Sequence, residues 1–522
     1  MKQLATLLLI LSFWLPVNGQ NDFYKKFDDS GVAGAAFFTC TPALSGFIFA
    51  GSATNLLFES NFLIARVSST GSVQQIRTFP ASGYNRISNV INTIDGNFAF
   101  FGEELDNSFV GKVTLFKTDV VGNISFIKSF ASGLHSLSSR SIVQDAAGNY
   151  YLVGSASNSS TFISDVCIIK TDANGNLLDQ KLLSLGTGFN AIDLIATGSS
   201  GILISGYADN GNSIETIGMV RLDASLNIVS TKWFSDPSTD YFVYDLKEKP
   251  NGNIVFCGRY SDGVNPYAAL VAEMDATGSI LWSKQYSGDL GLSLNGYSLL
   301  LMPDGSILVG GEASLAIMGG ENHIFAMNLD GTTGNLNWAK RVVSATTSEN
   351  LYEMKLTNGG DVVAAGIHSG YGGMIRTNAN FDLCADIPYQ ITTTNVTLSV
   401  DPSTATSSAV TLSVTTPTIS VASFTSINDA CLGVGIADDM EALNISVFPS
   451  PASDVVTISH DKNSELKVTA IYDITGRSIQ PEILENNSGS VSLSVSKLND
   501  GIYFAEINTN DTLKRIKFVV TH

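Results

Sequence analysis

Polar and aromatic side chains recur at two positions of a repeated pattern in this chain, and they are the best candidates for ligand binding. One set directly follows apolar runs that end in glycine, and its members are Glu103, Tyr207, Arg259, Glu312 and His368. A second set lies upstream, near the start of the expected inner strands: Arg86, Arg140, Asn190, Tyr241, Asn295 and Asn350. Guanidinium, phenol and amide groups can together hold carboxylates or sugar hydroxyls. Each of these residues could also simply be a solvated loop residue, and that alternative stays open.

The sequence shows no catalytic or metal-binding constellation. The histidines have no HExxH spacing, the chain has no GxSxG segment, and its 5 cysteines lack the spacing of metal ligands. Residues 172–176 (DANGN) partly resemble a calcium loop, but the closing bidentate carboxylate is missing, so we interpret Asp172 as a turn residue. We therefore predict no catalytic residue, metal or cofactor. Carboxylate pairs formed across loops, as in glycoside hydrolysis, stay open as an alternative.

A repeat of about fifty residues organises the chain up to residue 384. Apolar runs ending in glycine recur at Gly51, Gly102, Gly154, Gly206, Gly258, Gly311 and Gly366. Turn signals such as Asn251-Gly252-Asn253 precede most of these runs, and a second turn and an aromatic-rich strand follow them. Four short strands per repeat at this period are typical of propeller blades. The sequence predicts an all-β chain in which residues 21–384 form a seven-bladed β-propeller.

The last repeat lacks its aromatic outer strand, and the start of the chain contains one. Residues 23–27 (FYKKF) resemble residues 124–130 (ISFIKSF). We expect this N-terminal strand to complete the last blade and so close the ring. The alternative is that residues 381–391 supply that strand themselves.

Composition and the first residues indicate an exported protein. The chain has 522 residues and a formal net charge of −19, which disfavours nucleic acid and anionic membranes as partners. Residues 1–20 combine Lys2, an apolar stretch and small residues before a cleavage point, as in a signal peptide. No other segment is apolar enough to span a bilayer, so we expect no membrane insertion.

The region after the repeats changes in character. Residues 385–435 are rich in Thr, Ser and Val in period-two alternation, which predicts a β-rich connector. Cys384 and Cys431 bracket this connector, and we expect them to form a disulfide in an oxidising compartment. The acidic residues 436–444 form an expected linker.

Residues 445–522 contain three short blocks that carry a family resemblance. These blocks are residues 447–452 (VFPSPA), 471–477 (IYDITGR) and 498–504 (LNDGIYF), followed by a basic and apolar terminal strand. The region resembles the type A C-terminal sorting domain of the Bacteroidetes type IX secretion system, with Ser450 where the family usually has Asn. The residues that carry the resemblance are Pro449, Pro451, Gly476, Arg477, Gly501 and Tyr503. The resemblance implies export through the periplasm by the type IX machinery, to the outer cell surface or the medium.

These observations favour a non-catalytic binding or adhesion module that holds an extracellular glycan or protein. Its binding face is expected at the variable loops 52–61, 103–111, 155–165, 207–217, 259–268, 312–323 and 367–373. An extracellular glycan-active hydrolase or lyase, and a passive structural surface protein, are the alternatives. An enzyme should gather its charged and aromatic groups in one pocket, whereas a binder should present a broader patch.

Overall fold

The protein is described from a computed structural model, and its described residues contain β-strands and no helix. They comprise residues 22–522 except 28–31, 57–58, 80–82, 187, 199–200, 210–214, 236–237, 290, 316–321, 343–347, 384–385, 402–404, 418–421, 425–426, 430–444, 461–465, 474–476, 488–489 and 510–511. The expected signal peptide, acidic linker and Cys384–Cys431 pair lie outside them. The chain divides into two compact units, Met1–Ala430 and Cys431–His522. The prediction of an all-β chain is confirmed.

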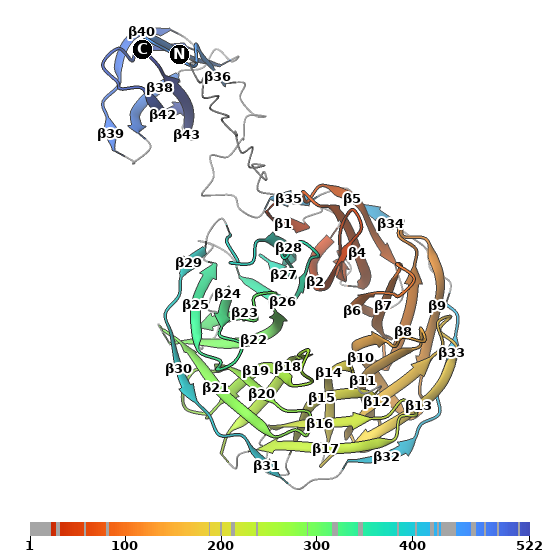
Figure 1. Cartoon of the computed structure of the whole chain (residues 1–522). Helices are drawn as coiled ribbons and strands as arrows, with labels where there is room; N and C mark the ends of the chain where they lie inside the picture. The colour runs from red at the N-terminus through yellow and green to blue at the C-terminus, as the bar shows by residue number, and fades with distance from the viewer. Residues whose placement is uncertain are drawn as a thin grey trace, which may run out of the picture. The chain divides into compact units, whose positions relative to one another are not determined.

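The first unit consists of antiparallel meanders arranged as a ring around a central axis (Figure 1). The strands nearest the axis are β2 (Val32–Ala43), β6 (Tyr84–Asn92), β10 (His135–Gln144), β14 (Phe189–Thr197), β18 (Asp240–Glu248), β22 (Leu292–Leu301) and β26 (Glu349–Leu356). The second strands are β3 (Gly46–Asn55), β7 (Phe98–Leu105), β11 (Tyr150–Asn158), β15 (Gly201–Asp209), β19 (Ile254–Ser261), β23 (Ile307–Leu315) and β27 (Val362–His368). The third strands are β4 (Ser60–Ser68), β8 (Gly111–Thr118), β12 (Ser164–Thr171), β16 (Glu215–Leu222), β20 (Ala268–Met274), β24 (Asn322–Leu329) and β28 (Tyr371–Thr377). The fourth strands are β5 (Val73–Phe79), β9 (Ile124–Ala131), β13 (Leu177–Ser184), β17 (Ile228–Ser235), β21 (Ile280–Gly288), β25 (Leu336–Val342) and β1 (Phe23–Phe27).

Most meanders form a sheet of their own, and two of them share one. The meanders β2–β5 and β6–β9 belong to a single ten-stranded sheet. They are joined within it by one parallel residue pair, Ser60 with Tyr84. Apolar side chains of neighbouring meanders pack into shared core clusters, as Tyr286 of β21 does with Leu299 of β22. Burial between sheets therefore stabilises the ring, because no meander covers both of its own faces.

The turns between strands follow the chemistry expected from their residues. Gly252, between β18 and β19, has a φ of 84°, a conformation that glycine adopts without strain. In the turn after β12, the Asp172 carboxylate accepts hydrogen bonds from the backbone N–H groups of Asn174 (2.9 Å) and Asn176 (2.8 Å). This is an Asx turn, and it accounts for the recurring aspartates.

The first and last segments of the repeat region share one sheet. Strand β1 pairs antiparallel with β28, from Phe23 opposite Arg376 to Phe27 opposite Gly372. The buried Tyr24 hydroxyl lies 3.0 Å from His368 Nδ1, and that nitrogen lies 2.9 Å from Glu349 Oε1. The two ends of the repeat region are thus joined by backbone pairing and by a buried polar contact.

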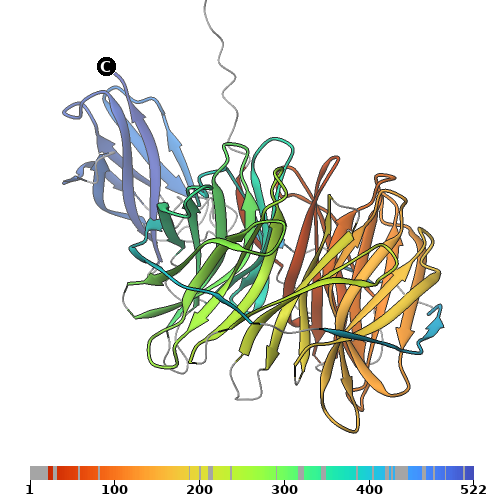
Figure 2. The same ribbon diagram turned by 60° about the horizontal axis from the view of Figure 1, so that its bottom comes forward.

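The connector supplies an extra outer strand to each meander. Its strands are β29 (Asp386–Pro388), β30 (Ile391–Asn395), β31 (Ser399–Asp401), β32 (Thr406–Ala409), β33 (Ser413–Thr415), β34 (Ala422–Phe424) and β35 (Ile427–Asp429). They pair in this order with β25, β21, β17, β13, β9, β5 and β1. The connector therefore runs around the outside of the ring against the order of the repeats, as Figures 1 and 2 show. We call residues 386–429 the outer belt.

The second unit is a small two-sheet β module with one core. One sheet has the order β36–β37–β41–β40 and the other β39–β38–β42–β43. The strands are β36 (Ile445–Phe448), β37 (Val455–His460), β38 (Leu466–Asp473), β39 (Ser478–Ile479), β40 (Glu482–Asn487), β41 (Ser490–Ser494), β42 (Gly501–Thr509) and β43 (Thr512–Val520). Tyr503 is buried on Phe518, and its hydroxyl donates to the Asn499 carbonyl at 2.9 Å. Pro449 and Pro451 follow cis peptide bonds, Arg477 is exposed, and Gly476 lies outside the described residues.

Candidate functional site

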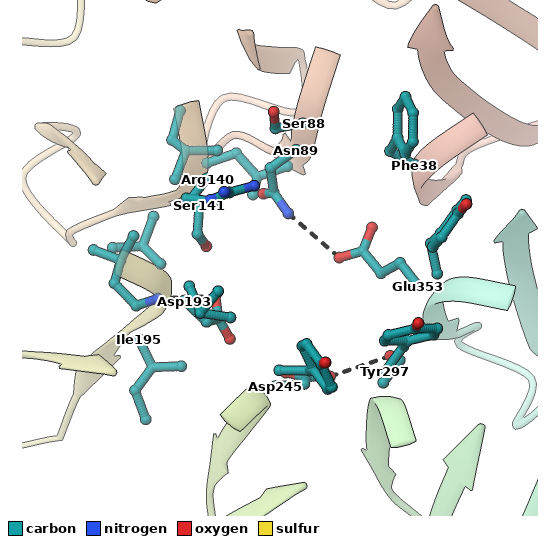
Figure 3. Close-up of a pocket in the computed structure, with 18 of the residues that line it drawn as sticks. Phe38, Ser88, Asn89, Arg140, Ser141, Asp193, Ile195, Asp245, Tyr297 and Glu353 are labelled. Atoms are coloured by element: carbon teal, nitrogen blue, oxygen red, sulfur yellow. Dashed lines mark hydrogen bonds between the residues drawn. The ribbon is translucent and has the colours of Figure 1, made fainter. Parts of the chain in front are cut away.

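A central cavity of about 330 Å³ lies between the inner strands of the first unit. Figure 3 shows the side chains that line it, contributed by strands on all sides of the axis. Its lining mixes aromatic, acidic and basic groups, among them Tyr244, Asp245, Lys247, Glu353 and Arg140. A polar cavity that draws on the whole ring is the natural candidate for the functional site.

Every inner strand carries a β-bulge at the same level, and the bulges decide what faces the cavity. In β18 the register shifts between Val243 and Asp245, so Tyr244 is the extra residue. The equivalent extra residues are Phe38, Ser88, Arg140, Ile192, Tyr244, Tyr297 and Tyr352, and all of them line the cavity. A bulge re-aims the side chains of its strand, and here it turns one residue per inner strand toward the axis.

The repeated glycine lies opposite the bulge and makes room for it. A Cβ atom at Gly258 would lie 1.8 Å from the carbonyl oxygen of Phe242, and one at Gly366 would lie 1.9 Å from that of Asn350. The other repeat glycines meet a backbone carbonyl of the bulged strand in the same way, at 1.7–2.6 Å. The repeat glycines, which are the clearest sequence signal of the repeat, are thus needed to form the cavity wall, because only glycine permits this backbone approach.

At five of the seven bulges, the residue after the bulge ties neighbouring inner strands together. Asp245 Oδ2 accepts from the backbone N–H of Leu299 at 2.8 Å, and Ser298 Oγ accepts from that of Met354 at 3.0 Å. The same bond joins Thr39 to Val90 N at 3.0 Å, Asp193 to Leu246 N at 3.4 Å, and Glu353 to Cys40 N at 3.0 Å. These polar side chains are therefore part of the ring's framework as well as of the cavity wall.

Two partly buried ion pairs also line the cavity. Lys247 pairs with Asp245, and Lys355 Nζ lies 2.6 Å from Glu353 Oε1. Burial, together with the neighbouring Asp245 carboxylate, raises the pKa of Asp193 to about 7. Burial is the largest single influence on the Lys355 ammonium and by itself lowers its pKa. The carboxylates of Glu353 and Asp245 together outweigh it, so the pKa of Lys355 is raised. This part of the cavity is balanced in charge by its own residues.

The mouth of the cavity is lined by a continuous arc of aromatic rings. Ring centroids lie 5.3 Å apart for Phe38 and Tyr352, 6.0 Å for Tyr352 and Tyr297, and 4.9 Å for Tyr297 and Tyr244. The arc continues through Phe242, which is 6.2 Å from Tyr244 and 5.3 Å from Tyr207. We call these six rings, Phe38, Tyr207, Phe242, Tyr244, Tyr297 and Tyr352, the mouth arc.

Three arginines lie beside the mouth arc, and two of them, Arg140 and Arg259, form no salt bridge among the described residues. Arg86 lies over Phe38 and pairs with Glu103, with its Nε 2.7 Å from Glu103 Oε1. The Arg259 guanidinium lies between two rings, 3.8 Å from the centroid of Phe242 and 4.5 Å from that of Tyr267. Arg140 points into the cavity, and its Nε is buried without a hydrogen-bond partner in the described structure, as is Nε of Arg259. Burial and the nearby Arg86 lower the pKa of Arg140, and the nearby Glu103 carboxylate opposes this shift.

The two sets of candidates from the sequence meet at this mouth as neighbours on paired strands. Arg86 pairs with Glu103, Asn190 with Tyr207, and Asn295 with Glu312. Tyr297 donates a hydrogen bond to Glu312 Oε2 at 3.2 Å, and Asn350 Nδ2 donates to the Tyr352 hydroxyl at 3.2 Å. Burial raises the pKa of Glu312.

Not all of the candidates reach the cavity. Arg140 alone of the eleven lines it, while Arg86, Tyr207, Arg259, Glu312 and Asn350 contact its aromatic lining or the mouth arc. Tyr241 is buried in an apolar cluster, edge-to-face with Tyr260, and His368 is buried against Tyr24. Strand alternation points these two side chains between sheets instead of toward the axis.

Sequence reasoning named Arg140 but missed the other bulge residues, although a signal for them exists. Tyr244, Tyr297 and Tyr352 each precede the glycine of their repeat by 14 residues, as do Ser88, Arg140 and Ile192. Aligning the repeats on their glycines therefore brings the bulge residues into one column. The bulges themselves cannot be recognised from one sequence, because an extra residue looks like any other strand residue.

Comparison with known proteins identifies the second unit. Residues 446–521 match the secretion system C-terminal sorting domain. The expected sorting domain is confirmed, and it implies interaction with the type IX secretion machinery. The protein is exported to the cell surface or secreted, as expected. Across the described residues, no helix is long and apolar enough to cross a membrane.

The first unit has only distant likenesses. No curated protein matches the chain. A Dyadobacter fermentans protein of unknown function is similar at 12% identity and a TM-score of 0.40, over 55% of this chain and 93% of its own. A PL25 ulvan lyase is similar at 8% identity and a TM-score of 0.47, over 68% of this chain and 95% of its own. The NanB sialidase of Streptococcus pneumoniae is similar at 11% identity and a TM-score of 0.39, over 68% of this chain and 70% of its own. Likenesses this weak carry no conclusion about activity.

Proposed function

We propose that the first unit is a seven-bladed β-propeller that binds a carboxylate-bearing ligand at the mouth of its channel. We further propose that this is a non-catalytic binding or adhesion module, displayed or released after export by a type A sorting domain. The propeller would span residues 21–384, and residues 385–435 would form the connector that wraps it.

The observation that carries this proposal is the pair of guanidinium groups at the mouth. The chain has 48 acidic residues against 29 basic ones, so most cations have a carboxylate within reach. Arg140 and Arg259 nevertheless form no salt bridge among the described residues, and the rings of Phe242 and Tyr267 lie against the Arg259 guanidinium. Leaving a buried guanidinium nitrogen without a partner costs free energy unless a ligand satisfies it. A carboxylate suits this group, because it accepts two parallel hydrogen bonds from a guanidinium.

The aromatic lining indicates that a sugar carries the carboxylate. Rings of the mouth arc offer flat apolar surfaces, while the Tyr and Asn groups beside them offer hydrogen bonds. A uronate combines a carboxylate, hydroxyl groups and an apolar ring face in one unit. We therefore name a uronate as the simplest ligand that uses all three features.

The test measures binding of galacturonate, and of its uncharged methyl ester, to the full mature chain by calorimetry. We expect galacturonate to bind at least about tenfold more tightly than the ester, the equivalent of one charge-assisted hydrogen bond. Arg140→Ala and Arg259→Ala should each remove this difference. The matched control is Arg477→Ala, which removes an exposed arginine of the sorting domain. Equal binding of acid and ester, or unchanged binding by both mouth variants, would refute the proposal.

A glycan-active enzyme is the second candidate, and one contact favours it. Glu312 combines a raised pKa with a hydrogen bond from Tyr297, so a protonatable carboxyl group lies at the same mouth as the arginines. Incubating the chain with polygalacturonate and measuring new reducing ends and unsaturated products distinguishes the two. Turnover that is lost in Glu312→Gln would replace the binding proposal by an enzymatic one.

A further inference from the structure

Beside the channel mouth, two adjacent meanders expose a row of large apolar side chains. Its members are Tyr84, Phe109, Leu134 and Phe162, with side chains 45%, 67%, 71% and 85% exposed. They belong to the meanders β6–β9 and β10–β13, which also carry Arg86 and Arg140. We call these four residues the apolar ridge.

Ring stacking and hydrogen bonds within the loops hold the ridge residues in place. The rings of Tyr84 and Phe109 are stacked, with centroids 5.9 Å apart and planes 15° from parallel. The Ser136 hydroxyl lies 3.4 Å from the Phe109 carbonyl oxygen, which links the two meanders. On the far side, the Ser159 N–H donates to the Leu134 carbonyl at 3.1 Å and so joins the loop of Phe162 to Leu134. The four side chains are thus connected along the face by short polar contacts beneath them.

Two of the ridge residues have a strained, left-handed backbone conformation. Phe109 has a φ of 59° and Phe162 a φ of 58°, a left-handed conformation that bulky residues rarely adopt. Glycine would occupy either position at lower conformational cost. Because both loops keep an exposed phenylalanine where glycine is cheaper, the ring itself is the feature that needs explaining.

The direction of the strands connects the ridge to the mouth. Tyr84 and Arg86 are two residues apart on β6, so their side chains project from the same face of the strand. Leu134 lies immediately before β10, which carries Arg140 at its bulge. A ligand that starts at the arginines can therefore continue onto the ridge, but it must be longer than one sugar unit to reach both.

We propose that the apolar ridge and the channel mouth together bind an extended acidic polysaccharide. Uronate carboxylates of the polymer are held at Arg140 and at Arg259, and other sugar rings of the same polymer stack on Tyr84, Phe109 and Phe162. This inference rests on the proposed function, to which it adds the ligand's polymeric nature. The unpaired arginines favour an anionic polymer, and the flat aromatic surfaces favour one built of sugar rings.

The experiment compares galacturonate with polygalacturonate on the full chain carrying Phe109→Gly and Phe162→Gly. Glycine removes each ring while relieving the positive-φ strain, so the variant should remain folded, which its unfolding temperature checks. We expect polygalacturonate affinity to fall about tenfold or more, because two of the flat surfaces on which its sugar rings stack are lost. Galacturonate affinity should stay unchanged. Leu44→Gly, which removes an exposed apolar side chain from the turn between β2 and β3, outside the variable loops, is the matched control.

Each outcome separates this inference from the proposed function. If the variant binds both probes as the natural chain does, the ridge is not a binding surface, although the mouth proposal stands. If polymer and monomer bind the natural chain with equal affinity per site, the extended-ligand inference is overturned on its own. If neither probe binds, the proposed function itself fails, and the inference fails with it.

Discussion

The carboxylate of Glu353 accepts a hydrogen bond from the backbone N–H of Cys40 at 3.0 Å, across 313 positions of the chain. The same carboxylate also contacts the Thr39 hydroxyl at 2.5 Å, Lys355 Nζ at 2.6 Å and Asn89 Nδ2 at 3.4 Å. Glu353 belongs to the last inner strand of the ring and Cys40 to the first. One side chain therefore joins the two ends of the ring while also lining the central cavity.

Replacing Glu353 by alanine should destabilise the first unit strongly. The change leaves the Cys40 N–H, the Thr39 hydroxyl and the Lys355 ammonium without their acceptor in a buried place. We expect a loss of about 3 kcal/mol in the free energy of unfolding, measured by urea denaturation of the full chain. Glu59→Ala, at an exposed carboxylate, is the control and should change it by less than about 0.5 kcal/mol. A loss no larger than that of the control would show that the bond across the ring is not stabilising.

The repeat glycines should not tolerate even one added methyl group. Gly258→Ala places a Cβ 1.8 Å from the Phe242 carbonyl oxygen, and backbone must move to relieve the clash. We expect a loss of about 3 kcal/mol or more, or failure to fold. Gly133→Ala has no atom within 4 Å of the new Cβ and should leave the unfolding temperature unchanged. Equal unfolding temperatures for the two variants would contradict the role given to the bulge.

Asp193 should make the first unit less stable as pH rises. Its pKa is about 7 in the folded chain, against about 3.9 in an unfolded one. Between these two values the folded state binds more protons than the unfolded state, so the free energy of unfolding falls with rising pH and the penalty is complete above pH 7. Asp193→Asn removes the effect, and its stability relative to the natural chain should improve by about 2 kcal/mol from pH 5 to pH 8. A constant difference at all pH values, measured by urea denaturation, would disprove the assignment.

The outer belt should contribute to the stability of the ring through its buried side chains. Leu412 is buried in the same apolar cluster as Phe130 and Leu182, whereas Val414, two residues later, is 41% exposed. We expect Leu412→Ala to cost about 2–3 kcal/mol in unfolding free energy and Val414→Ala to cost less than about 0.5 kcal/mol. Thermal unfolding of both variants tests this directly. If both behave like the natural chain, the belt is an attached segment that does not stabilise the sheets.

Local sequence patterns predicted much of this fold. Alternating apolar residues and turn signals around Gly252 and Asp172 predicted the strands and turns, because these preferences act over a few residues. The resemblance of residues 23–27 to other outer strands pointed to the strand that pairs with β28. The short blocks around Pro449 and Tyr503 predicted the sorting domain, because a complete small domain carries its own motif.

The site was predicted only in part. The repeated spacing brought Arg86, Arg140, Tyr207, Arg259 and Glu312 to one end of the ring, since equivalent positions of a repeat occupy equivalent places. It did not distinguish these residues from Tyr241 and His368, which point between sheets. Nor did it indicate Tyr244, Tyr297 and Tyr352, which enter the cavity through bulges.

The sequence by itself therefore determined the all-β class, the repeat with its glycines, and export from the cell. Each of these depends on local preferences or on a contiguous motif. Only the tertiary structure decided which side chains meet at the axis. A bulge of one residue reverses the facing of every later side chain in its strand, and on the inner strands the glycine of the next strand leaves room for it. The belt likewise takes its place because unpaired outer strands offer backbone groups to it, and those edges exist only once the sheets have formed.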